Sequence, residues 1–324
     1  MHAGGKESMV RKSILAVCLI GLTLPGLARA ADIFEKVGTF DGQFLKINVG
    51  ARSTGMGGAF VAVSDDASAL YWNCAGIARI EGSQLQLNNA IWIADMQFNQ
   101  IGYVFHIKKF PGAFGLNARS LSMKPMVETT AYQPDPVVGT GNTFDAGMMS
   151  LGLTYSRSFT DKFSAGVTAN FIHEGLADLS QQTYAFDIGT LYDVGTLGMK
   201  IGMSIQNIGT QIKFIDREGR IPSIFRVGTS FQMLNSADNK LIGSFEFSHP
   251  PDNSERMNVG AEYTFKDFVK LRGGYNINYD ADALAGGVGF RFPISSMGKA
   301  DLDYSYTEMR DLGGVNRFSL QFGF

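Results

Sequence analysis

The chain ends in Arg317-Phe-Ser-Leu-Gln-Phe-Gly-Phe324, where large apolar side chains alternate with polar or small ones. Successive side chains of a β-strand point to opposite faces, so this stretch predicts a strand with two different faces. One face carries Phe318, Leu320, Phe322 and Phe324, and the other carries Arg317, Ser319, Gln321 and Gly323. This pattern is the unit from which the rest of the chain is interpreted.

The same alternation recurs from Gln84 to the C-terminus. It predicts fourteen strands, at residues 84–96, 98–108, 112–123, 144–159, 162–174, 183–194, 198–214, 223–234, 240–249, 255–266, 268–279, 282–293, 299–309 and 315–324. An even number of antiparallel strands is what a closed bacterial barrel requires when both of its ends lie on one side of the membrane.

The composition of the polar face distinguishes a barrel from a water-soluble β-sandwich. A solvated sheet face usually carries many Lys and Glu, whereas here the polar positions are mostly Gly, Ser, Thr and Asn. Charged residues make up 18% of the chain, below the roughly 25% of typical soluble domains. Aromatic residues near predicted strand ends suit the interfacial girdles of a membrane barrel, and we assign Tyr192, Phe214, Phe268 and Tyr279 to them.

The N-terminus predicts export. Arg11 and Lys12 precede an apolar run that ends at Leu24, and small residues lead to Ala30, so we expect a signal peptide over residues 1–30, cleaved after Ala30. Beyond it, no apolar run reaches the 18 residues of a helical span, so a membrane location requires a closed barrel. Cleavage would leave a single cysteine, which excludes a disulfide framework.

The predicted connections alternate in length. Those at 109–112, 160–161, 195–197, 235–239, 266–267 and 295–298 are short, whereas those at 124–143, 174–182, 211–222, 250–254 and 310–314 are longer. Outer-membrane barrels have short periplasmic turns and longer external loops. We therefore expect the N-terminal segment and the C-terminal residue to lie together on the periplasmic side, with Phe322 and Phe324 meeting the barrel-assembly machinery.

Residues 31–82 lack the two-residue alternation and are rich in glycine. We predict that they form an N-terminal hatch that plugs the lumen of a barrel formed by residues 83–324. Glycines allow tight turns and close backbone packing there. A short helix is expected from Ala67 to Tyr71, capped by Ser64 or Asp65.

The hatch segment carries the run Gly55-Met-Gly-Gly-Ala-Phe-Val-Ala-Val-Ser-Asp-Asp-Ala-Ser-Ala-Leu-Tyr-Trp-Asn-Cys-Ala-Gly76. This run resembles the hatch of the FadL-like outer-membrane proteins, and of their PorV/PorQ branch in particular. The stretches Gln206-Asn-Ile-Gly209, Pro222-Ser-Ile-Phe-Arg-Val-Gly228 and Leu271-Arg-Gly-Gly-Tyr275 also resemble that branch.

The resemblance implies a fourteen-stranded outer-membrane barrel with a lumenal hatch. It also implies two roles of different kinds, because PorV members serve type IX protein secretion whereas other relatives admit fatty acids or aromatic hydrocarbons. The hatch residues that the resemblance marks as gating or plugging positions are Gly55, Gly57, Gly58, Asp65, Asp66, Tyr71, Trp72, Asn73, Cys74, Ala75 and Gly76. One position departs from the family, whose motif reads Asn-Pro-Ala where this chain has Asn73-Cys74-Ala75, and this puts the hatch turn in question.

Other functions find little support. The glycines at 55–58 lack the Lys-Ser/Thr pair and the strand-helix context of a phosphate loop. The Asp65-Asp66 pair suits a helix cap or hatch-to-barrel pairing better than a cation site. The three histidines of the mature chain, at 106, 173 and 249, show no metal spacing, so we expect no metal, no cofactor and no catalysis.

The net charge is -2 and the sequence contains no basic stripe, which argues against a nucleic-acid partner. Charged residues predicted to face the lumen are expected to pair with each other and with the hatch; they are Arg226, Arg272, Arg291, Arg317, Asp187, Glu246, Glu262, Asp301 and Asp303. The leading hypothesis is a barrel that assists protein secretion together with secretion-system components. Uptake of a hydrophobic ligand and a structural surface role, in contact with outer-membrane lipid, are the alternatives.

Overall fold

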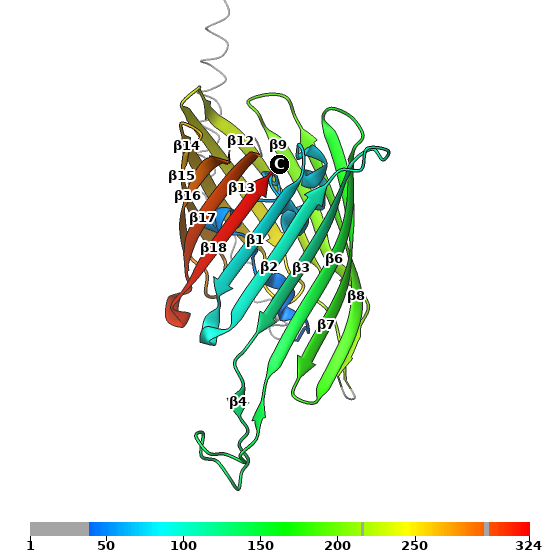
Figure 1. Cartoon of the computed structure of the whole chain (residues 1–324), viewed down its shortest axis with the longest axis vertical. Coiled ribbons are helices and arrows are strands. Elements are labelled where there is room, and N and C mark those ends of the chain that lie inside the picture. The colour runs from blue at the N-terminus through cyan, green and yellow to red at the C-terminus, as the bar shows by residue number, and fades with distance from the viewer. Residues whose placement is uncertain (1–38, 215–216, 295–297) are drawn as a thin grey trace, which may run out of the picture. The chain divides into compact units, whose positions relative to one another are not determined.

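The computed structural model describes residues 39–214, 217–294 and 298–324, which form one compact unit. Fourteen strands close into an antiparallel barrel in the order β1-β18-β17-β16-β15-β14-β13-β12-β9-β8-β7-β6-β3-β2 (Figure 1). The fold class predicted from the alternation is confirmed. The predicted signal peptide and its cleavage point lie outside the described residues.

All fourteen predicted strands are present. Their bounds are β1 (Gln84–Ile91), β2 (Gln97–Phe105), β3 (Ala113–Ser122), β6 (Ala146–Ser158), β7 (Phe163–Leu176), β8 (Leu179–Asp193), β9 (Lys200–Gly209), β12 (Ile224–Asn235), β13 (Asn239–His249), β14 (Arg256–Phe265), β15 (Val269–Ile277), β16 (Leu284–Ile294), β17 (Gly298–Glu308) and β18 (Gly314–Gly323). The barrel closes where β1 pairs with β18, with Leu87 opposite Leu320. Two short hairpins lie outside the wall, β4 (Met126–Val127) with β5 (Thr143–Phe144) and β10 (Ile212–Phe214) with β11 (Arg217–Gly219).

The alternation sorts side chains between the outer wall and the lumen. On β18, Arg317 and Ser319 are buried inside the barrel, whereas Phe318 between them is exposed on the outer wall. The outer wall carries further exposed apolar side chains, among them Leu153, Phe186 and Leu302. An apolar exterior of this kind suits hydrocarbon rather than water.

Short connections gather at one end of the barrel, which we call the turn end, together with Phe324 (Figure 1). The opposite end, here called the loop end, carries the connection at residues 123–145, whose hairpin β4–β5 projects beyond the other loops. One predicted long connection is wrong. Residues 174–182 continue β7 and β8 and leave only a turn at Ala177 and Asp178, with a positive φ of 50° at Ala177.

The hatch, residues 39–82, contains four short helical elements: η1 (Gln43–Lys46), α2 (Ala51–Gly55), α3 (Ala69–Trp72) and η2 (Cys74–Arg79). The short helix predicted from Ala67 to Tyr71 is present as α3, with its bounds shifted to Ala69–Trp72. Neither Ser64 nor Asp65 caps it. Instead Asp66 accepts hydrogen bonds from the amide and the hydroxyl of Ser68, which precedes the helix.

The direction of the hatch differs from the expectation. At the loop end, the Asp41 amide donates to the Arg220 carbonyl at 2.9 Å, and Lys46 forms an ion pair with Asp252. At the turn end, the Ser83 amide donates to the Phe324 carbonyl at 2.7 Å. The described chain therefore enters the barrel opposite to its C-terminus. A segment without alternation gives no information about direction, which is why the sequence could not reveal this.

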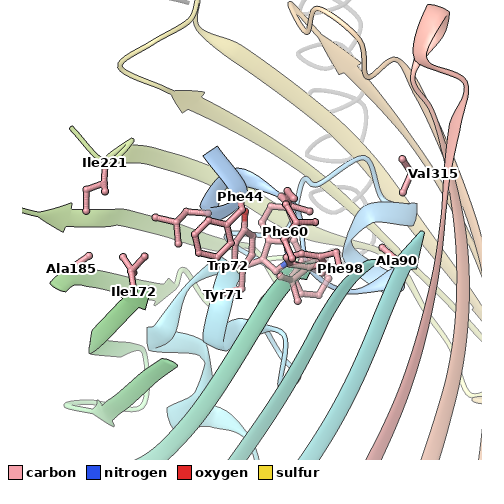
Figure 2. Packing of buried hydrophobic residues seen from close by; sticks show 14 of the residues in the cluster. Phe44, Phe60, Tyr71, Trp72, Ala90, Phe98, Ile172, Ala185, Ile221 and Val315 are labelled. Atoms are coloured by element: carbon pink, nitrogen blue, oxygen red, sulfur yellow. The ribbon is translucent and has the colours of Figure 1, made fainter. Parts of the chain in front are cut away.

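An aromatic cluster inside the barrel joins the hatch to the wall (Figure 2). Trp72 is fully buried, and the ring of Tyr71 meets it edge-on at 5.1 Å. The Trp72 indole donates to the Val49 carbonyl at 2.9 Å, so its polar group is satisfied as a buried indole requires. Phe60 of the hatch and Phe98 of β2 belong to the same cluster.

Of the predicted girdle aromatics, Tyr192 and Phe268 are exposed on the outer wall. Tyr279 is not a girdle residue, because its hydroxyl bonds Asn258 and its ring lies under Arg256 at 4.5 Å inside the barrel. The side chain of Phe214 lies outside the described residues. No helix of residues 39–214, 217–294 and 298–324 is long and apolar enough to cross a membrane, a finding that does not bear on crossing by strands.

Candidate functional site

The hatch lies directly against the backbone of the wall at several glycines. A Cβ on Gly274 would overlap the Gly57 amide nitrogen, and one on Gly260 would overlap the Met56 carbonyl. A Cβ on Gly55 would lie 3.2 Å from the Gly287 Cα, which is a tight contact. Gly57 also has a positive φ of 64°, which side chains adopt rarely. The glycines therefore allow the hatch and the wall to meet backbone to backbone.

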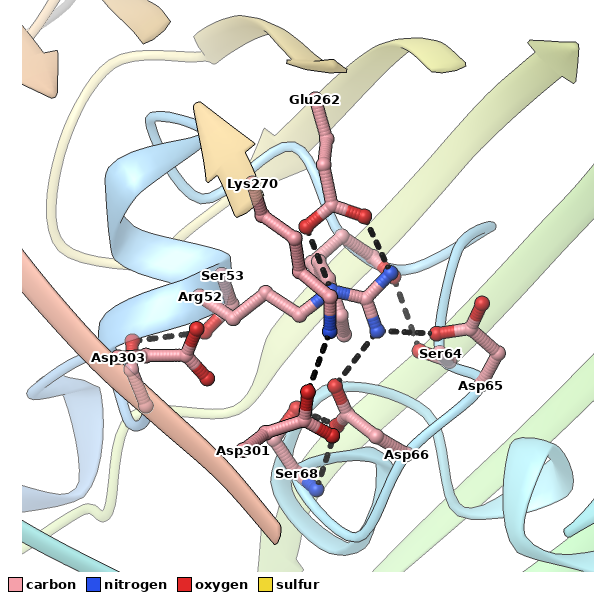
Figure 3. Close-up of polar contacts among 12 residues, drawn as sticks. Arg52, Ser53, Ser64, Asp65, Asp66, Ser68, Glu262, Lys270, Asp301 and Asp303 are labelled. Atoms are coloured by element: carbon pink, nitrogen blue, oxygen red, sulfur yellow. Dashed lines mark hydrogen bonds and ion pairs between the residues drawn. The ribbon is translucent and has the colours of Figure 1, made fainter. Parts of the chain in front are cut away.

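Arg52 is the centre of a charge cluster at this contact (Figure 3). Its guanidinium bonds Asp65 at 2.5 Å and Asp66 at 2.7 Å, both in the hatch. It also forms a two-bond fork with Glu262 of β14, at 2.9 Å from Nε and 2.8 Å from Nη2. Burial acts to lower the pKa of Arg52, but these carboxylates raise it well above its ordinary value. The guanidinium therefore stays charged.

The cluster continues along the wall through lumen-facing charges, all of which the sequence predicted except Lys270. Glu262 also bonds Arg272 at 2.6 Å, and Arg272 bonds Asp303 at 2.6 Å. Lys270 bonds Asp301 at 2.8 Å. A charged pocket of about 200 Å³ opens beside these groups, and Asp267 in the turn between β14 and β15 contributes to its lining.

Sequence reasoning missed Arg52, although the predicted Asp65-Asp66 pair makes the hatch-to-barrel contact through it. The signal that could have revealed it is an arginine in the same glycine-rich segment as two adjacent aspartates.

A second polar contact holds the middle of the hatch. Glu246 of β13 accepts hydrogen bonds from the amides of Phe60 and Val61, at 3.0 and 2.8 Å. Arg226 of β12 bonds the same carboxylate at 2.8 Å and lies over the Trp72 ring at 5.0 Å. The charge of Glu246 is thus shared between the wall and two hatch amides.

The Asn73-Cys74-Ala75 turn forms without the family proline. The Asn73 side chain accepts from the Ala75 amide and donates to the carbonyls of Val61 and Thr190, each at 2.9 Å. Cys74 is buried against Gly189, and burial raises the pKa of its thiol to about 12. Gly76 follows, where a Cβ would overlap the Ser64 carbonyl. Asn73 therefore supplies the bonds that fix the turn.

Tyr71 adjoins an irregularity in the wall. Arg119 of β3 lies over the Tyr71 ring at 5.4 Å, and burial raises the pKa of the Tyr71 phenol. The register between β8 and β9 shifts beside Asp187, which accepts the Asn207 amide at 2.7 Å. Asn207 has a positive φ of 58°, typical of a β-bulge. Polar hatch and wall side chains thus fill the space behind the bulge.

The remaining predicted residues lie apart from the hatch contacts. Phe324 is 59% exposed on the outer wall and stacks on Tyr103 at 6.4 Å, beside Phe322 on the same strand face. Their role in barrel assembly stays a prediction. Within the part of the chain that the structure describes, no three His, Cys, Asp or Glu side chains are placed to hold a metal ion.

The sequence matches a family model described as Type IX secretion system protein PorV over residues 31–250. The chain belongs to the PorV family. No curated protein sequence matches this PorV family member. Because the family model includes the hatch and the barrel strands up to β13, the resemblance predicted from the hatch residues is confirmed.

Solved structures of similar fold include two toluene transporters and a FadL homologue. The Ralstonia pickettii toluene transporter TbuX has 15% identity and a TM-score of 0.58, covering 86% of this chain and 98% of its own. The Pseudomonas putida toluene transporter TodX has 11% identity and a TM-score of 0.57, covering 85% and 96%. A Pseudomonas aeruginosa FadL homologue has 13% identity and a TM-score of 0.55, covering 85% and 98%. At these identities the likeness shows the FadL-like fold alone, and with the family it places the chain in the outer membrane.

Proposed function

We propose that this PorV family barrel assists the secretion of proteins across the outer membrane as a docking partner, without enzymatic activity, rather than as a conduit. The observation that carries the proposal is the combination of an occupied lumen with a projecting hairpin. The hatch contacts the lumenal side of the wall from Gly115 on β3 to Gly287 on β16. Space for cargo inside the barrel is thereby restricted, so its outer surfaces are the available docking sites.

The hairpin β4–β5 offers such a surface at the loop end. Tyr132 is 96% exposed, and Val137 and Val138 are also exposed. Glu128 accepts hydrogen bonds from Thr140 and Asn142, at 2.7 and 3.3 Å, which tie the two arms of the hairpin together. Apolar side chains held out on an ordered projection are costly in water and favour contact with another protein.

The alternative function is uptake of a hydrophobic small molecule. It is favoured by an apolar pocket of about 350 Å³ on the outer wall of β3, β6, β7 and β8, lined by Leu153, Ala169 and Phe171 among others. No hatch residue lines this pocket, and the nearby bulge at Asn207 is backed by polar wall side chains together with Leu45 and Leu70 of the hatch. We therefore place uptake second. A purely structural surface role is the remaining alternative.

The test compares hairpin variants in cells that produce this protein. Tyr132→Ser with Val137→Ser should leave the barrel folded but cause exported proteins to accumulate in the periplasm. The matched control is Leu312→Ser, which removes an exposed apolar side chain from another loop. Purification in mild detergent, with mass spectrometry of accompanying proteins and lipids, gives the second readout. Unchanged secretion together with a co-purified hydrophobic small molecule would reverse the order of the two functions.

A further inference from the structure

Arg52 holds the α2 segment of the hatch to the wall through charge, whereas Tyr71 and Trp72 are held by the aromatic cluster. We propose that α2 and its flanks, residues 50–58, are a releasable seal of the barrel, and that Arg52 is the clamp that keeps the seal closed. The proposal concerns permeability and holds whether the barrel serves secretion or uptake. It therefore stands or falls separately from the proposed function.

The α2 segment and helix α3 of the hatch are held by different kinds of interaction. The aromatic cluster anchors Tyr71 and Trp72 by apolar burial. Met56, next to α2, belongs to the same cluster, but α2 itself is held by polar contacts: the Ala51 amide donates to Ser319 at 2.7 Å, and the hydroxyls of Thr54 and Ser305 are 2.8 Å apart. Polar contacts of this kind can be exchanged for hydrogen bonds to water at small net cost. The α2 end can therefore leave while α3 stays anchored.

The strand pairing of the wall does not depend on the hatch. Some of its polar lumenal side chains bond each other, as Gln100 does with Asn117 at 2.6 Å and Thr154 does with Thr168 at 2.8 Å, whereas others, such as Glu246 and Asn258, bond the hatch. Every strand of the barrel has two paired neighbours. A polar bore of this kind can hold water once α2 moves aside, because water can replace the hatch as the partner of these side chains.

The charge balance of the clamp explains why α2 stays in place. Asp66 is buried, and Arg52 is its ion-pair partner at 2.7 Å. Glu262 would keep Arg272 if Arg52 were lost, but Asp66 would be left as an uncompensated buried charge. Asp65 is 40% exposed beside the charged pocket, so solvent already reaches this side of the clamp. Loss of the Arg52 charge should therefore favour the state in which α2 has moved aside and water reaches Asp66.

The experiment measures ion conductance of the full chain in planar lipid bilayers. Arg52→Met keeps the length of the side chain and removes its charge. We expect open events to be more frequent than in the unaltered protein by on the order of 100-fold. The matched control is Arg79→Met, because Arg79 is the hatch arginine that bonds the Lys162 carbonyl and the Ser164 hydroxyl, with Asp193 only at 3.8 Å. The control should remain as closed as the unaltered protein.

Two further variants separate release of α2 from general damage. Asp66→Asn, combined with Arg52→Met, removes the stranded charge and should return the barrel to the closed state. Thr54→Cys with Ser305→Cys places two thiols where the hydroxyls now meet, close enough for a disulfide. In the Arg52→Met protein, this disulfide should abolish the current, and reduction should restore it.

The shift in electrophoretic mobility on heating identifies barrels that are folded. A folded Arg52→Met barrel that stays as closed as the unaltered protein would overturn the proposal. A current that persists with the Thr54→Cys–Ser305→Cys disulfide formed would also overturn it, because the conducting path would then not depend on α2.

Discussion

At the scale of single residues, the contact between hatch and wall depends on the absence of side chains as much as on their presence. Gly260 and Gly274 face the lumen and let the hatch backbone lie directly on the strands. Arg52 and Glu246 then supply charge at points where hatch amides or carboxylates need a partner. Close backbone packing and a few buried ionic groups act together, because the glycines bring the charges within bonding distance.

Gly273 and Gly274 provide a matched pair that tests this packing. A Cβ at Gly274 would overlap Gly57, whereas one at Gly273 meets nothing within 4 Å. We expect Gly274→Ala to lower the free energy of unfolding by about 1–3 kcal/mol through overpacking. Gly273→Ala should change it by less than about 0.5 kcal/mol. Urea titration followed by heat-modifiable mobility in gels measures both values, and equal effects would argue against backbone contact at Gly274.

Cys74 occupies the position where the family motif has proline, and the local backbone explains why either residue fits. Cys74 is the first residue of η2, where the amide has no acceptor within the helix. Asn73 before it is extended, with φ of -160° and ψ of 100°, as the residue before a proline prefers.

We therefore expect Cys74→Pro to change stability by less than about 1 kcal/mol. Ala75→Pro is the control, because the Ala75 amide donates to Asn73 and its loss should cost about 3 kcal/mol. The same urea titration measures both. A large loss of stability in Cys74→Pro would mean that the turn has adapted to cysteine.

At the scale of elements, β9 shows how one residue shapes the wall. Asn207 has a left-handed conformation, its amide bonds Asp187, and its side chain donates to the Pro222 carbonyl at 3.1 Å. The strand ends two residues later, at Gly209, before the predicted boundary at 214. The alternation extended the prediction because it does not register a backbone reversal that asparagine can adopt.

Asn207→Val tests the bulge. A β-branched residue is strained at positive φ and cannot replace the bond to Pro222, so we expect a loss of about 2–3 kcal/mol in the free energy of unfolding. Asn207→Gly keeps the backbone conformation and should lose only about 1 kcal/mol. Urea unfolding again gives the comparison, and an equal loss in the two variants would show that strain at this residue is unimportant.

The elements of the wall were predictable because lipid on one side and a polar lumen on the other impose a two-residue period on every strand. The hatch was recognisable as different, and its helix α3 was predicted to within two residues, but its other helical elements and its direction did not follow from its sequence. Its structure is set by contacts between residues far apart in the chain, such as Arg52 with Glu262 and Phe60 with Glu246. Such partners leave no local pattern in the sequence. The contacts between the predicted hatch residues and the wall could therefore be found only in the structure.

At the scale of the whole molecule, the described chain begins at the loop end and finishes at the turn end. Short turns and the C-terminus mark the periplasmic side of outer-membrane barrels, so the loop end faces outward. Asp41 lies beside Arg220 and Lys46 pairs with Asp252 at the loop end, whereas Phe44 and Leu45 between them are already buried inside the barrel. The described part of the hatch therefore begins at the external end of the lumen and runs through the barrel to the turn end before the first strand.

This topology predicts that Thr39→Cys reacts with a membrane-impermeant maleimide in intact cells. Asp161→Cys, in the turn between β6 and β7, is the control and should react only after the outer membrane is permeabilised. Both positions are exposed, so access should be set by the side of the membrane rather than by burial. Cys74 gives little background, because it is 4% exposed and burial raises its pKa to about 12, which leaves almost no reactive thiolate at neutral pH. If Thr39→Cys reacted only under the conditions that label Asp161→Cys, the hatch would have to enter from the periplasm, and the path from loop end to turn end would be wrong.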